Sequence, residues 1–180
     1  MPDPSASSQP TRSPLTLIVM GVSGSGKTEV GKRLAAHLEG VFEDGDDFHS
    51  EEAKDKMRAG IPLTDEDRKP WYARMRRRIV DMRDAGENYV LACSALKAVY
   101  RDWLRVSDSP DQMKFVFLDG DFDLIHARMA LRQGHYMPVS LLESQFAALE
   151  KPGDEVLRVS ITGTLEEIAA EVISLLSARQ

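Results

Sequence analysis

The chain has 180 residues, of which 42% are hydrophobic and 29% are charged, and its net charge is −6. This length and composition are typical of one soluble globular domain. The negative charge argues against nucleic acid as the main partner. The only cysteine, Cys93, excludes an internal disulfide framework, and no apolar run approaches the roughly 20 residues that span a bilayer. We therefore expect a cytoplasmic protein with no nucleic-acid or membrane partner.

The first 13 residues are rich in Ser and Pro and contain no apolar stretch. A segment of this composition cannot bury enough apolar surface to offset the entropy cost of ordering, and it has no signal-peptide pattern. We expect residues 1–13 to form a disordered tail and residues 14–180 to form a single domain.

The strongest motif follows the apolar stretch 15–20, which predicts a buried strand. The next eight residues fit G-x-x-x-x-G-K-[ST], the phosphate-binding loop, and apolar residues at helical spacing follow over 29–39. In such a loop the glycines let backbone N–H groups point at phosphate oxygens, the lysine reaches the β- and γ-phosphates, and the hydroxyl can ligate Mg²⁺. The predicted ATP-binding residues are Gly21, Val22, Ser23, Gly24, Ser25, Gly26, Lys27 and Thr28.

A second short strand is predicted at 41–43, and it ends in the polar stretch 44–49, Asp-Gly-Asp-Asp-Phe-His. Open parallel sheets place their active sites just past such strand ends. Asp-rich turns are often only solvated, but a phosphate loop requires a carboxylate near Mg²⁺ and near the attacking hydroxyl. We assign this role to Asp46.

Two helices are predicted next, one capped by Ser50 and one that begins with a capping box at Thr64. The second helix carries an arginine run, which indicates a solvated face rather than a nucleic-acid surface in so acidic a chain. Arg68 lies at the start of this helix, apart from the run, and is the better candidate for a ligand contact.

The stretch 88–93 predicts a central strand that is buried on both faces, so Cys93 is expected to be an inert core thiol. In the helix that follows, Lys97, Arg101 and Arg105 recur every four residues and therefore share one face. Lys97 and Arg101 lie nearest the end of the strand, where an anionic substrate would bind. Arg105 is interpreted as a surface charge.

A fourth strand is predicted at 114–118. The helix that follows begins near Phe122 and carries Arg128 and Arg132. A glycine-containing break separates it from a second helix that reaches Leu149. This arrangement indicates a lid, at about 122–149, that closes over a bound nucleotide. The alternative for both arginines is ordinary surface charge.

Strands and helices alternate through the chain, which predicts an α/β fold with a five-stranded parallel sheet and helices on both faces. The lid places it in the small-kinase branch of the P-loop NTPases. The third strand has no acidic residue at its end, so Asp46 must serve the metal, and this favours phosphorylation of a small acceptor. The sequence contains no Asn-Lys-x-Asp stretch, which would indicate a GTPase, and no Leu-Ser-Gly-Gly-Gln stretch, which would indicate a transporter ATPase.

Several stretches together resemble the small P-loop gluconokinases, the thermoresistant gluconokinase family. They comprise the phosphate loop, Asp44-Gly45-Asp46 with His49, and residues 62–71, 93–97, 100–102, 118–122, 134–135, 145–146 and 150–153. The resemblance runs from about Leu15 to Ile161. It implies a fold like that of nucleoside monophosphate and shikimate kinases, Mg²⁺-dependent phosphorylation of D-gluconate by ATP at the 6-hydroxyl, and a homodimer.

The resemblance and the motifs together assign roles to individual residues. The residues expected to act in catalysis are Lys27, Asp46, Arg128 and Arg132, and those expected to hold Mg²⁺ are Thr28 and Asp46. The residues expected to hold gluconate are Asp44, His49, Arg68, Lys97 and Arg101, the three basic ones being candidates for its carboxylate. Two alternatives stay open: a kinase for shikimate or another sugar acid, and a nucleotide-binding regulator without turnover.

Overall fold

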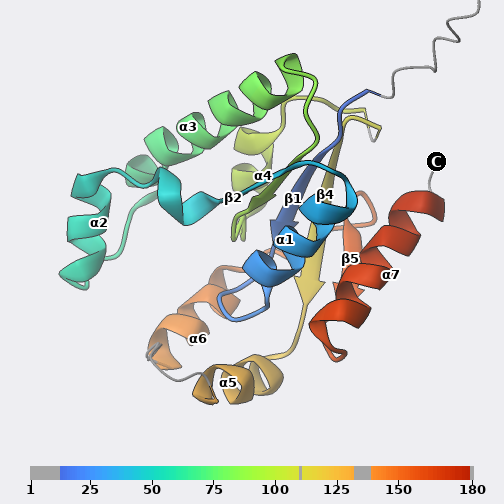
Figure 1. Cartoon of the computed structure of the whole chain (residues 1–180). Helices are drawn as coiled ribbons and strands as arrows, with labels where there is room; N and C mark the ends of the chain where they lie inside the picture. Colours follow the sequence, from blue (N-terminus) through green and yellow to red (C-terminus); the bar gives the residue numbers. More distant parts are fainter. Residues whose placement is uncertain (1–12, 110, 132–138, 179–180) are drawn as a thin grey trace, which may run out of the picture.

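The computed structural model describes residues 13–109, 111–131 and 139–178 (Figure 1). Five parallel strands form one sheet in the order β2-β3-β1-β4-β5. The strands are β1 (Thr16–Met20), β2 (Val41–Asp44), β3 (Tyr89–Ala92), β4 (Met113–Asp119) and β5 (Leu157–Ser160). The helices are α1 (Lys27–His37), the 3-10 helix η1 (Gly45–Phe48), α2 (Glu51–Arg58), α3 (Asp65–Asp84), α4 (Ala98–Leu104), α5 (Phe122–Ala130), α6 (Val139–Ala148) and α7 (Leu165–Ala178). The predicted α/β fold is confirmed, while the predicted tail lies outside the described residues apart from Ser13.

Helices cover both faces of the sheet (Figure 1), and each face packs in its own apolar layer. Side chains of β1 alternate between them: Leu17 and Val19 pack in the layer of α1 and α7, whereas Ile18 and Met20 pack in the layer of α3 and α4. All four side chains are fully buried, and each such burial stabilises the fold by about 1.5–3 kcal/mol. Period-two alternation with both faces apolar is what a central parallel strand requires.

The chain reverses its direction of travel across the sheet at β1. It runs from β1 through α1 to the edge strand β2 and returns to β3, which pairs with one side of β1. It then passes to β4, which pairs with the other side of β1. Ligands of open α/β sheets bind at such a switch point, beyond the carboxyl ends of the strands. The predicted phosphate loop leaves β1 at this place.

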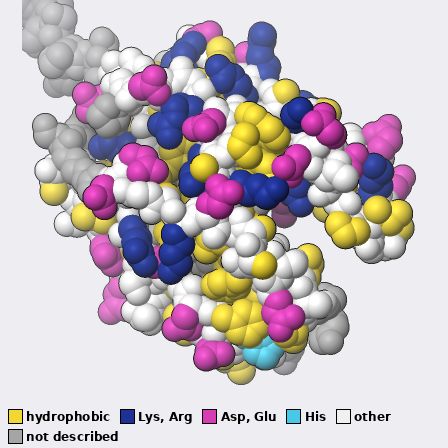
Figure 2. Space-filling view, turned by 180° about the vertical axis from the view of Figure 1, so that it is seen from behind, with side chains coloured by type: hydrophobic (Ala, Val, Ile, Leu, Met, Phe, Trp, Pro, Cys, Tyr) yellow, Lys and Arg dark blue, Asp and Glu magenta, His cyan; other side chains and the backbone are white. Residues whose placement is uncertain are grey.

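The arginine-rich face of α3 is occupied by ion pairs. Arg77 contacts Asp81 at 2.9 Å, and Arg78 contacts Glu43 at 2.8 Å. On the face shown in Figure 2, Lys and Arg side chains stand among Asp and Glu side chains and do not form a continuous basic surface. None of the described helices is long and apolar enough to cross a membrane.

Candidate active site

At three positions of the loop 21–26, the backbone has a positive φ value that favours glycine. Gly21, Gly24 and Gly26 have φ values of 142°, 81° and 96°. A Cβ atom on Gly21 would lie 2.9 Å from the carbonyl oxygen of Leu118, and one on Gly24 would lie 2.7 Å from Cγ of Met129. Gly26 caps α1 without a side-chain hydrogen bond, so the first N–H groups of the helix are directed at the loop cavity rather than at a capping side chain.

The first two residues of α1 carry the polar groups that the motif predicts. Nζ of Lys27 donates a 3.0 Å hydrogen bond to the carbonyl oxygen of Val22, so its side chain arches back over the loop. The hydroxyl of Thr28 donates a 2.8 Å hydrogen bond to Oδ2 of Asp44, at the end of β2. The other oxygen of Asp44 accepts the backbone N–H of Asp46 at 3.1 Å and caps η1. Asp44 thus stands beside the Thr28 hydroxyl, whereas the sequence assigned it to the acceptor.

Asp46 projects from η1 with 89% of its side-chain surface exposed. The protein around it still displaces part of the bulk water and raises the pKa of Asp46; the Asp44 carboxylate adds to this rise, while Lys27 opposes it. A carboxylate with a raised pKa is a better proton acceptor than an ordinary surface aspartate. The position and the electrostatics of Asp46 therefore suit the predicted role at the attacking hydroxyl.

A stacked pair of aromatic side chains, Trp71 and His49, supports the turn η1. Nε1 of the buried Trp71, in α3, donates a 2.6 Å hydrogen bond to the carbonyl oxygen of Gly45. The Trp71 ring stacks on His49 with centroids 4.1 Å apart and an interplanar angle of 15°. Nε2 of His49 lies 4.0 Å from Oδ1 of Asp46. Trp71 is therefore both a buried core residue and a support for the predicted catalytic turn.

His49 is buried and neutral at pH 7. Its side chain is 6% exposed, and its Nδ1 is buried without a hydrogen-bond partner. Burial lowers the pKa of His49 to about 4, and the positive charges of Arg68, Arg74 and Lys54 act in the same direction. A neutral imidazole can both donate and accept hydrogen bonds, which is the capacity needed to orient a hydroxyl group.

The basic residues Arg68 and Lys97 converge on the ring of Tyr100. Nζ of Lys97 lies 5.3 Å from the ring centroid and Cζ of Arg68 lies 5.9 Å from it. Nζ of Lys97 also donates to both oxygens of Asp65 at 3.1 Å, and the Tyr100 hydroxyl donates to Oδ1 of Asp65 at 2.5 Å. The Tyr100 and Lys97 hydrogen bonds lower the pKa of Asp65, in that order. We call these four residues the basic wall; Asp65 and Tyr100 were not singled out in the sequence, although both lie in the stretches that carry the family resemblance.

Arg68 and Lys97 are not equivalent in this wall. Lys97 is already paired with Asp65. Arg68, among the residues that the structure describes, has no carboxylate within ion-pair distance, and its guanidinium lies over the Tyr100 ring. Arg68 is therefore the better placed of the two to receive an added anion.

Arg101 lies inside the protein rather than on the basic wall. Its side chain is buried, with the residue 5% exposed, and Nη1 donates to the carbonyl oxygens of Ala95, Leu96 and Glu150, each at 3.2 Å. These bonds join the start of α4 to the segment that follows α6. Lys97 is the N-cap of α4, with an extended backbone, and pairs with Asp65, whereas the Arg101 guanidinium is already engaged by backbone oxygens.

The predicted lid is described only in part, since Arg132 and the segment up to residue 138 lie outside the described residues. On α5, Nη2 of Arg128 donates to the carbonyl oxygen of Gly163 at 3.2 Å, in the loop before α7. On α6, the side chain of Gln145 accepts the backbone N–H of Ser23 at 2.6 Å. Sequence reasoning gave Gln145 no role, and only its place in one of the family stretches could have drawn attention to it.

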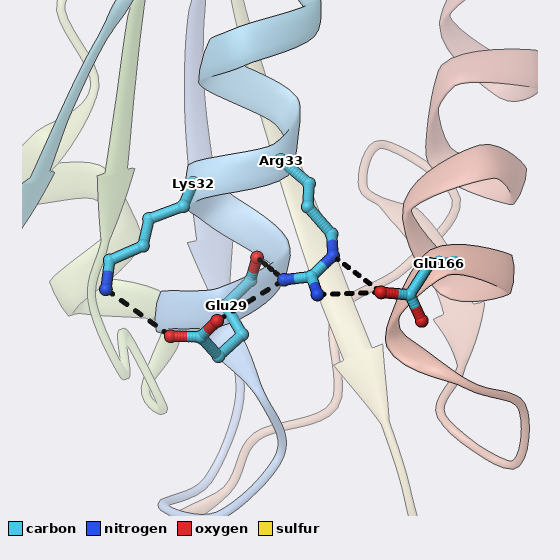
Figure 3. Close-up of polar contacts among 4 residues, drawn as sticks. All are labelled: Glu29, Lys32, Arg33 and Glu166. Atoms are coloured by element: carbon cyan, nitrogen blue, oxygen red, sulfur yellow. Dashed lines mark hydrogen bonds and ion pairs between the residues drawn. The ribbon is translucent and has the colours of Figure 1, made fainter.

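One ion pair joins α1 to α7, and two more lie within α1 beside it (Figure 3). Arg33 contacts Glu166 at 2.7 Å and Glu29 at 3.3 Å, and Lys32 contacts Glu29 at 3.3 Å. Exposed pairs of this kind contribute about 0–1 kcal/mol each. We interpret this network as structural.

Comparison with known proteins shows the family to which this chain belongs. A phosphate loop at the switch point of a parallel sheet, opposite a basic wall, defines a P-loop kinase for a small acceptor, and the family model "Shikimate kinase" matches residues 23–158. The thermosensitive gluconokinase of Escherichia coli K12 is 46% identical over 159 residues, covering 87% of this chain and 84% of that protein. The gluconokinase of Gluconobacter oxydans 621H is 47% identical over 149 residues, covering 82% and 83%. The chain belongs to the gluconokinase family.

Solved structures of related proteins support the family membership and the fold. The crystal structure of a gluconokinase from Sinorhizobium meliloti 1021 is similar with a TM-score of 0.82 and 43% identity, covering 93% of this chain and 94% of that one. A shikimate kinase from Aquifex aeolicus, 15% identical with a TM-score of 0.54, covers 92% of this chain and 98% of that one and shares the fold.

Proposed function

We propose that the protein transfers the γ-phosphoryl group of ATP to the 6-hydroxyl of D-gluconate, giving 6-phospho-D-gluconate and ADP. The observation that carries this proposal is that the turn with Asp46 and His49 is close to charges of both sides: beyond the effect of burial, Lys27 of the phosphate loop acts on the pKa of Asp46, and Arg68 of the basic wall acts on the pKa of His49. One side suits a polyphosphate and the other suits an anionic acceptor. The gluconokinase relatives, similar over most of the chain, point to the same acceptor.

The residues beside the phosphate loop fit Mg²⁺. This ion prefers oxygen ligands and is usually held by one or two protein groups together with substrate phosphates. The Thr28 hydroxyl lies 2.8 Å from the Asp44 carboxylate. Besides burial, the Asp44 carboxylate also raises the pKa of Asp46, so the two carboxylates are close to each other beside the phosphate loop. We propose that Thr28 and Asp44 hold Mg²⁺, directly or through water, with Asp46 contributing. When bound, the ion neutralises phosphate charge.

The chain's own groups then perform the positioning that phosphoryl transfer needs. Lys27 and the loop amides hold the β- and γ-phosphates. Asp46 orients the 6-hydroxyl and accepts its proton as the bond to phosphorus forms. Arg128 neutralises charge that develops during transfer, and Arg132 is proposed to share this role on the family resemblance.

The acceptor contacts follow from the basic wall. Arg68 pairs with the gluconate carboxylate, and Lys97, held by Asp65, contributes a second charge-assisted donor. His49 hydrogen-bonds an acceptor hydroxyl. Arg101 serves the acceptor indirectly, because it fixes the backbone that carries Lys97.

The test is ADP release with ATP and Mg²⁺ over a panel of gluconate, other sugar acids, sugars, shikimate and nucleoside monophosphates. We expect strong turnover on gluconate alone. Preference for shikimate or another sugar acid would replace the acceptor but keep the phosphate chemistry. ATP binding with no turnover on any acceptor would support a nucleotide-binding regulator instead.

Three further expectations belong to the same proposal. The homodimer rests on the family resemblance, and light scattering coupled to size-exclusion chromatography measures it. The cytoplasmic location rests on the need for ATP. The lid at about 122–149 is supported by the contact of Arg128 with the loop before α7, where closure would bring it over the nucleotide.

A further inference from the structure

One contact joins the phosphate loop to α6 across 122 positions of sequence. The backbone N–H of Ser23 donates to Oε1 of Gln145 at 2.6 Å. Phosphate loops work by presenting backbone N–H groups to a nucleotide, so a side chain of the protein that takes one of them acts directly on the shape of the loop. In the described part of the chain, Nε2 of the same amide has no hydrogen-bond partner, so Gln145 also leaves an N–H donor beside the loop.

The helix that carries Gln145 is anchored in the core. Leu142, one turn earlier, is 1% exposed and packs in the same apolar cluster as Val22 of the loop. Phe146, the next residue, makes an edge contact with Phe122 of α5 at 5.6 Å between ring centroids. The contact at Ser23 therefore comes from a fixed element, which is the condition for holding a loop in one geometry.

Glu150, which follows α6, is hydrogen-bonded to the backbone on both sides of Lys97 in the basic wall. Oε2 of Glu150 accepts the backbone N–H of Ala98 at 2.7 Å, and the backbone N–H of Glu150 donates to the carbonyl oxygen of Leu96 at 2.9 Å. These two partners flank Lys97 of the basic wall. A single stretch, 145–150, thus touches the phosphate loop at one end and the backbone of the acceptor wall at the other.

We propose that Gln145 is a positioning residue for phosphoryl transfer. Its amide oxygen fixes the first half of the phosphate loop through Ser23, and the stretch 145–150 sets the distance between that loop and the acceptor wall. A neutral amide suits this place, because it accepts the Ser23 N–H without bringing negative charge toward the nucleotide phosphates. This inference rests on the kinase activity proposed above but not on the identity of the acceptor.

The test compares Gln145→Glu and Gln145→Met with the wild-type chain. Gln145→Glu keeps the size of the side chain and an acceptor for Ser23 but adds a negative charge, so we expect the Kd for a non-hydrolysable ATP analogue to rise about tenfold or more. Gln145→Met keeps the length but removes the acceptor. We expect it to lose the hydrogen-exchange protection of the Ser23 amide in the nucleotide-free protein and to lower kcat about tenfold, as expected for one hydrogen bond.

Glu143→Gln, an exposed charge change on the same helix, is the matched control and should leave the Kd, the hydrogen-exchange protection and kcat unchanged. A residue that only packs would give variants with lowered thermal midpoints, unchanged Kd for the analogue and unchanged kcat at a temperature where they are folded; that result overturns the proposal. If Gln145→Met does not fold, the isosteric Gln145→Glu decides: an unchanged Kd overturns the proposal and a raised Kd supports it. Because the Kd for the analogue and the hydrogen exchange of Ser23 are measured without acceptor, failure of gluconate as a substrate leaves these two readouts intact.

Discussion

The hydroxyl of Thr28, in the first turn of α1, donates its hydrogen bond to Oδ2 of Asp44 at the end of β2, 2.8 Å away. The contact joins the phosphate loop to the turn that carries Asp46, so the nucleotide side and the reacting hydroxyl share one support. An incoming Mg²⁺ would meet both oxygens at once. The proposed metal site is therefore built from two elements that only the fold brings together.

The first prediction concerns this pair. Asp44→Asn keeps an oxygen that can cap η1 but removes the charge, so we expect the Mg²⁺ concentration for half-maximal activity to rise about tenfold or more, by the weakening of a charge-assisted contact. A Mg²⁺ titration at saturating ATP measures it. An unchanged midpoint in the folded variant would remove Asp44 from the metal site.

The second prediction concerns Asp46. Asp46→Ala should lower kcat at least about a hundredfold, the usual scale for a group that handles a proton in the transition state. Because the side chain is 89% exposed, the free energy of unfolding should change by no more than about 0.5 kcal/mol. The exposed neighbour Asp47→Ala is the control and should keep near-normal kcat. Near-normal turnover in Asp46→Ala would exclude it from the chemistry.

The third prediction separates the two cations of the basic wall. Gluconamide, the uncharged amide of gluconate, lacks the carboxylate that Arg68 is proposed to bind. Arg68→Gln should therefore reduce the ratio of kcat/KM for gluconate over gluconamide about 10- to 100-fold, the value of a charged hydrogen bond. Lys97→Ala should raise KM for gluconate more than KM for ATP.

Lys97→Ala should also keep more of the gluconate preference than Arg68→Gln does, because Lys97 is shared with Asp65. The reverse order would exchange their roles. A larger effect of Lys97→Ala on ATP would place Lys97 on the nucleotide side. Both variants are compared at matched folded fraction, judged by circular dichroism.

The fourth prediction concerns pH. The folded-state pKa of His49, about 4, lies below its ordinary value of 6.5, so between these values the unfolded chain binds the proton and the folded chain does not. Stability from this group is therefore fully present above about pH 6.5 and is lost as the pH falls toward 4, by about 3 kcal/mol in total. Urea unfolding at pH 4.5, 5.5 and 7 measures the slope.

His49→Phe keeps a ring that can stack on Trp71 but cannot titrate, so its stability should fall less over that interval than that of the wild type. Identical slopes in the two proteins would show that His49 does not take up a proton on unfolding in this range. The comparison uses differences between two proteins at each pH, which removes the contribution of the carboxylates common to both.

The fifth prediction concerns Arg101. Its guanidinium serves three backbone carbonyl oxygens inside the protein. Arg101→Met should therefore lower the free energy of unfolding by about 2 kcal/mol or more, since buried acceptors lose their donor. A loss confined to KM for gluconate, with normal stability, would instead return Arg101 to direct acceptor binding.

The fold was predictable because its signals are local. Apolar strands, glycine breaks and helix caps such as Ser50 and Thr64 occur within a few residues of the elements that they delimit, and both caps form as expected. The phosphate loop was predictable for the same reason, since its chemistry is contained in eight consecutive residues. The 3-10 turn η1 was not foreseen as a helix, because its cap by Asp44 depends on how β2 ends.

The contacts that could not be predicted are those made across the fold. Helical spacing predicted that Arg101 shares a face with Lys97, but Lys97 is the extended N-cap of α4 rather than part of the helix. Spacing also does not reveal that carbonyl oxygens from residues 95, 96 and 150 converge on the Arg101 guanidinium. The same holds for Gln145 and Ser23, which are distant in sequence. Asp44 was assigned to the acceptor together with His49, whereas the fold sets its carboxylate against the hydroxyl of Thr28 in α1.

The thiol of Cys93, the only one in the chain, is buried at the end of β3, and this burial raises its pKa to about 12. At neutral pH the thiol is protonated and buried, so thiol-directed dyes and spin labels will not react with it in the folded protein. The protein is in this sense already a cysteine-free background. A cysteine introduced on α5 and another on α2 could carry a pair of probes without any prior substitution. The opening and closing of the site during a catalytic cycle could then be followed as a distance, one molecule at a time.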